Sequence, residues 1–156
     1  MIKAIDKSKE LSTSVKLIND RLSFSGIVGG NEPVLIDYIP PLGDNSGYTS
    51  LELLLLSLSS CIGSAVVVLL RKMRKTISGF EIKSHGIRKE DHPTGFKIIF
   101  LEVNITSDDI SETDIEKVLK LSEETYCPVW AMMKGNVEIR TEVRLSQSLS
   151  RNFANS

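Results

Sequence analysis

Residues 53–70 form a stretch of eighteen residues that contains no charged side chain. This length is at the lower limit for a membrane-spanning helix, and a basic segment, residues 71–75, follows it as it would on the inner side of a membrane. Three serines share one stripe of such a helix, which also suits close packing in a soluble core: Ser57, Ser60 and Ser64. We expect the soluble arrangement, because the rest of the chain supplies amphipathic strands that need a central helix.

Hydrophobic patterning around this stretch predicts strands and a second helix. Strands are expected at 15–28, 34–39, 80–89, 96–105 and 137–145, with a turn at 29–31. Thr49 and Glu52 fit a capping box at the start of the long helix. Ser111 is expected to cap an amphipathic helix that ends at Cys127-Pro128. The pattern predicts an α+β fold with antiparallel sheets.

Length and composition predict one domain over residues 1–156, with its core at about 15–145 and a polar tail at 146–156. The formal net charge is -1, which argues against a protein that grips nucleic acid over a broad face. The first residues, Met1-Ile2-Lys3-Ala4-Ile5-Asp6, contain no apolar signal segment. We expect a cytoplasmic protein that does not enter a membrane, in a compartment where thiols stay reduced.

The chain contains two cysteines, Cys61 and Cys127, which are 127 − 61 = 66 residues apart. Cys61 lies in the middle of the apolar helix, where it is either a small buried hydrophobic residue or a thiolate nucleophile that needs a nearby cation or hydrogen-bond donor. Cys127 lies at a helix end beside Pro128, a plausible place for a thiol that must be reached. Only the fold can bring the two sulfurs together, so both interpretations stay open at this point.

Two charged residues are further candidates. Glu52 can serve the capping box alone, or it can also hold an arginine. Arg21, in an early strand, either faces solvent or reaches a thiolate or carboxylate. His85 and His92 have no helpers at metal-ligand spacing, so no metal site is expected.

The segment from Gly47 to Leu55, GYTSLELLL, followed by Cys61, resembles the start of the central helix in the OsmC/Ohr family of osmotically inducible and organic hydroperoxide resistance proteins. The similarity continues through the basic segment, Phe80-Glu81-Ile82, the strand near Phe96, LSEETYCPV at 121–129, and the closing strand. It covers about residues 15–145. Leu51 stands where many members have proline, and the spacing of nine residues from Glu52 to Cys61 fits the broader OsmC-like branch.

The resemblance implies a fold and a chemistry. The fold would consist of antiparallel sheets wrapped around a long buried central helix, in an intertwined homodimer. Cys61 would attack an organic hydroperoxide and Cys127 would resolve the resulting sulfenic acid as a disulfide, with Glu52 and Arg21 as the candidate charged pair. No bound cofactor is implied, because an external dithiol or lipoyl-type reductant would reduce the disulfide.

Three functions follow as hypotheses. The first is a thiol-dependent peroxidase for organic hydroperoxides in oxidative-stress defence. The second is an OsmC-like protein that binds a small apolar ligand and has little or no peroxidase activity. The third is a membrane or assembly role for the apolar helix. A cation in contact with Cys61 would favour the first over the second.

Overall fold

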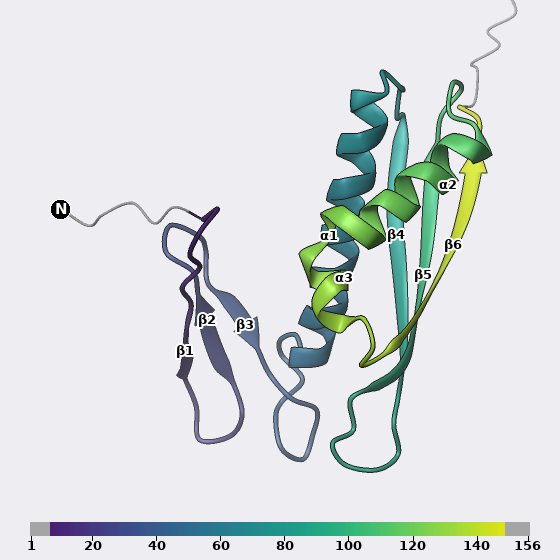
Figure 1. The fold of residues 1–156 in the computed structure, drawn as a ribbon. Helices are drawn as coiled ribbons and strands as arrows, with labels where there is room; N and C mark the ends of the chain where they lie inside the picture. Colours follow the sequence, from purple (N-terminus) through teal and green to yellow (C-terminus); the bar gives the residue numbers. More distant parts are fainter. Residues whose placement is uncertain (1–6, 149–156) are drawn as a thin grey trace, which may run out of the picture. The chain divides into compact units, whose positions relative to one another are not determined.

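The structure is a computed structural model that describes residues 7–148. The chain forms two compact units, Met1–Leu53 and Leu54–Ser156, which are drawn in Figure 1. Each unit is described by itself below. The assignment of residues 1–156 to one domain stays a prediction, and the predicted polar tail lies mostly outside the described residues.

The first unit contains an antiparallel sheet of three strands in the order β1 (Ser14–Leu17), β2 (Phe24–Ile27) and β3 (Val34–Ile36). The single strand predicted over residues 15–28 is therefore wrong, because a turn divides it into β1 and β2. Asn19 makes this turn: its side-chain oxygen accepts hydrogen bonds from the backbone N–H groups of Arg21 (3.0 Å) and Ser23 (3.1 Å). The predicted turn at 29–31 is present, with Gly30 at a φ of 83°.

The loop after β3 is organised by the buried carboxylate of Asp37. It accepts hydrogen bonds from the backbone and hydroxyl of Ser46 (3.0 and 2.7 Å) and from the backbone of Tyr38 and Asp44 (2.8 and 3.2 Å). The bonds from Ser46 contribute most to lowering the pKa of Asp37 from its usual 3.8 to about 2. The carboxylate therefore stabilises the folded loop above about pH 4, and this contribution disappears as the pH falls towards 2.

Gly43 lies against the backbone of the same loop. A Cβ atom at this position would lie 2.2 Å from the carbonyl oxygen of Tyr38, and backbone atoms cannot move away as a flexible side chain can. We expect Gly43→Ala to lower the free energy of unfolding by about 2 kcal/mol. Gly29→Ala is the matched control, because nothing lies within 4 Å of its added Cβ. Urea titration checks both, and equal midpoints for the two variants would contradict the close contact.

The second unit is built on a sheet in the order β4 (Gly79–Arg88), β5 (Phe96–Thr106) and β6 (Glu138–Ser146). The central position predicted for residues 96–105 is confirmed. β4 and β5 pair antiparallel, but β5 and β6 pair parallel, so the expectation of purely antiparallel sheets is wrong for this ladder. The reason is the connection between β5 and β6: it crosses through three helical segments, and such a crossover returns the chain in the same direction. The α+β class itself is confirmed.

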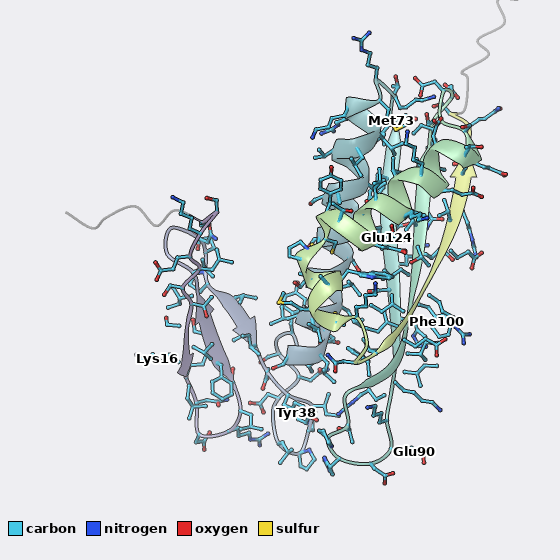
Figure 2. The ribbon with its side chains drawn as sticks, in the orientation of Figure 1. Lys16, Tyr38, Met73, Glu90, Phe100 and Glu124 are labelled. Atoms are coloured by element: carbon cyan, nitrogen blue, oxygen red, sulfur yellow. The ribbon has the colours of Figure 1, made fainter. Side chains whose placement is uncertain are left out.

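Helix α1 (Ser50–Lys72) covers the inner face of this sheet and runs beside β4 in Figure 1. Its Gly63 lies against Phe80 and Ile82 of β4. Four residues of α1 are fully buried at a spacing of four, namely Leu58, Ile62, Val66 and Leu70. In β5, Ile99, Leu101, Val103 and Ile105 are buried as well. Phe100 is on the opposite, outer face, as Figure 2 shows.

The opposite side of α1 remains largely uncovered within one chain. Leu56 and Val68 are 51% and 48% exposed. Among the described residues, α1 is long and apolar enough to cross a membrane. Core helices of soluble proteins share this property. The buried side of α1 packs on β4, where Gly63 lies against Phe80.

Candidate functional site

Cys61 is placed by the capping and packing of α1. The predicted capping box is confirmed: the backbone N–H of Thr49 donates to Glu52 Oε2 (2.7 Å), and the N–H of Glu52 donates to Thr49 Oγ1 (3.3 Å). From this start, Cys61 falls in the middle of the helix, next to Ile62, which points into the core. Cys61 is therefore at the edge of the buried face and is half-buried.

Cys127 is placed by an irregular turn. Helix α2 (Glu112–Leu121), capped by Ser111 as predicted, passes into one turn of π-helix, η1 (Ser122–Tyr126). The backbone N–H of Cys127 donates to the carbonyl of Ser122 (2.8 Å) and closes this wider turn. The short helix α3 (Pro128–Met133) then begins, because Pro128 has no N–H to continue the preceding helix. Turns of this kind occur frequently at functional sites.

The fold brings the two cysteines together. The side chains of Cys61 and Cys127 interact, although 66 residues separate them in the sequence. Cys127 is 2% exposed. This burial is the main reason why the pKa of Cys127 rises from 9.0 to about 11, and the interaction with Cys61 raises it further. The backbone N–H of Trp130, which lies 3.3 Å from Sγ, acts in the opposite direction and lowers the pKa. Cys127 is therefore a neutral thiol at physiological pH.

Cys61 lines a groove that Cys127 does not reach. The groove has a volume of about 380 Å³ and runs along α1 to its C-terminal end, with Tyr126 on the other side. Its remaining lining comes from α1: Ser64, Ala65, Val68, Leu69 and Lys72. The lining is mainly apolar, so the accessible thiol of the pair faces a space that suits an alkyl chain.

Glu52 and Arg21 belong to the first unit and have structural partners there. The Glu52 carboxylate completes the capping box, and Oε2 also accepts a hydrogen bond from the Thr49 hydroxyl (3.0 Å). Arg21 forms an ion pair with Asp44 (2.7 Å), and its guanidinium also donates to the carbonyl of Gly43 (3.4 Å). Their roles as charged partners of the thiolate stay predictions.

Over residues 7–148, no group of three or more His, Cys, Asp or Glu side chains could hold a metal ion. His85 instead stacks on Phe100, with ring centroids 6.4 Å apart, on the outer face of the sheet.

Sequence reasoning missed Lys72 and Tyr126 as groove residues. Basic side chains at the end of a helix are ordinarily solvated, because they complement the helix dipole there. The available signal was helical spacing, because Ala65, Val68 and Lys72 follow Cys61 by four, seven and eleven residues and so share its side of α1. Tyr126 carried no such signal, since only the fold brings η1 next to α1.

Comparison with known proteins agrees with this architecture. The model of the OsmC-like protein family matches residues 43–142. Escherichia coli Protein YhfA is 29% identical over 121 residues, which are 76% of this chain and 86% of YhfA. A crystal structure of an OsmC-like protein from Mycoplasma pneumoniae has a TM-score of 0.77 at 22% identity, covering 88% of this chain and 98% of that one.

A more distant structure is that of an organic hydroperoxide resistance protein, OsmC, from Legionella pneumophila. Its TM-score is 0.66 at 18% identity, with 85% of this chain and 96% of the other covered. This level of identity indicates a shared fold. The chain belongs to the OsmC-like protein family, and the resemblance noted in the sequence is confirmed.

Proposed function

We propose that this protein is a thiol-dependent peroxidase that reduces organic hydroperoxides in the cytoplasm as part of oxidative-stress defence. The observation that carries the proposal is the pairing of the two cysteines, in which Cys61 opens onto an apolar groove and Cys127 lies buried behind it. A thiol pair with one accessible and one protected member suits a reaction in which the first is oxidised and the second resolves it.

The reaction has three steps. The Cys61 thiolate attacks the distal peroxide oxygen, so that an S–O bond forms, the O–O bond breaks, and the alkoxide leaves and takes up a proton to become an alcohol. Cys61 is then a sulfenic acid. Cys127 attacks its sulfur, an S–S bond forms and water leaves. An external dithiol or lipoyl-type reductant exchanges with this disulfide, is itself oxidised to a disulfide, and restores both thiols.

Two further elements belong to this proposal. Arg21 and Glu52 are the charged pair that would favour the Cys61 thiolate, and the active form is a homodimer. The high pKa of Cys127 supports the division of roles, because the residue with a neutral thiol is poorly suited to make the first attack.

The proposal is tested with the unmodified protein and cumene hydroperoxide. One equivalent of peroxide should produce an intramolecular Cys61–Cys127 disulfide, seen by non-reducing mass spectrometry as the loss of two hydrogens. With excess dithiothreitol the protein should consume peroxide repeatedly. A sulfinic acid on Cys61 with Cys127 still free would exclude the resolving role.

A second candidate function is the binding of a small apolar ligand, which the mainly apolar groove favours. Under this alternative, neither cysteine would change its oxidation state with one equivalent of peroxide, and no peroxide would be consumed with dithiothreitol present.

A further inference from the structure

Helix α3 begins at the sulfur of Cys127. Pro128 is its first residue and has no N–H group, so the N–H groups that need a partner in the first turn start at Val129. Cys127 is the N-cap: its Sγ accepts the N–H of Trp130 at 3.3 Å and also interacts with the N–H of Val129. The cysteine that would resolve the sulfenic acid is therefore also the capping residue of the helix that follows it.

Helix α3 depends on this cap because it is short and little buried. It has six residues, half of the roughly twelve that an isolated helix needs to be even marginally stable. Met133 is its one buried residue, while Met132 is 70% exposed. Its other end is held by the N–H of Lys134, which donates to the carbonyl of Trp130 (2.8 Å). A helix with so little buried surface is expected to open locally when its cap is lost.

The segments on the other side of the cysteine pair are held more firmly. Ser122, at the start of η1, is fully buried, and its hydroxyl donates to a backbone carbonyl of α2 (2.7 Å). The next residue, Glu123, accepts a hydrogen bond from the Thr141 hydroxyl of β6 (3.1 Å). Cys61 lies within the 23 residues of α1, which packs on β4. A rearrangement at Cys127 is therefore directed into α3.

We propose that α3 is a redox-sensitive switch, which is helical when the two cysteines are thiols and opens at its first turn when they form a disulfide. This inference rests on the proposed function, in which Cys61 and Cys127 become a disulfide. Bond formation draws the two sulfurs together by on the order of 1 Å and ties the sulfur of Cys127 to α1. The sulfur then leaves the N–H group of Trp130, and the first turn of α3 loses its cap. Reduction restores the free thiol, and the cap with it.

The test forms the disulfide without peroxide, so that it does not depend on peroxidase activity. Diamide, an azo compound, takes two electrons and two protons from the two thiols and becomes a hydrazine, while an S–S bond forms. Hydrogen exchange measured by mass spectrometry then compares the dithiol and disulfide forms. Residues 128–134 should exchange about fivefold faster in the disulfide form, the effect expected for one lost cap. Residues 112–121 of α2 should not change, and dithiothreitol should reverse the difference.

Three variants separate the cap from the disulfide. Cys127→Ser cannot form the disulfide but keeps a hydroxyl, which is a good cap, so α3 should stay protected with or without diamide. Cys127→Ala loses both the disulfide and the cap, and its α3 should exchange about fivefold faster under either condition. Cys61→Ala is the matched control, because it keeps the capping thiol and should show no change in α3 with diamide.

The outcomes distinguish the switch from the peroxidase. If diamide forms the disulfide and opens α3 but the protein consumes no peroxide, the peroxidase function fails and the switch stands. If the disulfide forms and α3 exchanges as in the dithiol form, the switch is refuted, whatever the peroxidase activity. Equal protection of α3 in Cys127→Ala and Cys127→Ser would refute it as well. Failure of diamide to produce the disulfide would overturn the switch and the resolving role together.

Discussion

Replacing Cys61 by serine is expected to lower dithiol-dependent kcat/KM for cumene hydroperoxide by more than about 100-fold, to the level of the reaction without protein. A serine hydroxyl is not ionised at neutral pH and cannot be oxidised to a sulfenic acid, so the first step has no nucleophile. The substitution should leave the fold intact, because Cys61 is half-buried and serine already occurs at several positions of α1. Peroxide consumption followed with dithiothreitol gives the rate, and circular dichroism checks the helix.

Cys127→Ser is the matched variant, and it should behave differently. It keeps the attacking thiol, so one equivalent of peroxide should still be consumed, but no intramolecular disulfide can form. Repeated exposure should convert Cys61 to sulfinic acid and stop turnover. If Cys61→Ser consumed peroxide at the rate of the unmodified protein, the mechanism would be wrong.

The elements that could be predicted from sequence are those with local chemical signals. Thr49 and Glu52 fixed the start of α1, Ser111 fixed the start of α2, and Cys127-Pro128 marked its interruption. The first two predictions rest on side chains that form hydrogen bonds with the backbone a few residues away. The third rests on a proline, which has no N–H to donate. The central position of residues 96–105 followed from apolar residues on both faces of that segment.

The features that could not be predicted depend on contacts between distant residues. The division between β1 and β2 depends on the Asn19 side chain, which accepts hydrogen bonds from the backbone of Arg21 and Ser23. The sequence on either side of Asn19 is equally typical of a continuous strand. The parallel pairing of β6 depends on how three helical segments cross the sheet. The pairing of Cys61 with Cys127 and the groove that Tyr126 completes form only when α1 and η1 lie side by side.

The burial of side chains in the two units differs sharply. Every hydrophobic residue that is buried within residues 7–148 belongs to Leu54–Ser156, starting with Leu58. In the described part of Met1–Leu53 the buried side chains are polar, those of Ser23 and Asp37. A sheet of three strands needs an apolar face packed against another layer to be stable. One chain therefore leaves this requirement unmet for its first unit.

The first sheet nevertheless has an apolar face. Strand register places five hydrophobic side chains on the same side, namely Val15, Leu17, Phe24, Val34 and Ile36. Val15 and Leu17 remain 60% and 50% exposed in the single chain. A second copy of the chain would cover this apolar face. The homodimer that we propose would thus supply the missing layer.

We expect this homodimer to be obligate, with an apolar interface of roughly 2,000 Å² or more. Dilution should give unfolded chains and no folded 17.3 kDa species, because separation would expose these apolar faces to water. Leu17→Glu should weaken the dimer and the fold together by placing a charge on the covered face. The neighbouring residue Lys16, which is labelled in Figure 2, points to the other face of the sheet. Lys16→Glu should therefore have little effect. Analytical ultracentrifugation from nanomolar to micromolar protein, with circular dichroism on the same samples, decides the matter: a folded monomer at micromolar concentration would refute the obligate dimer.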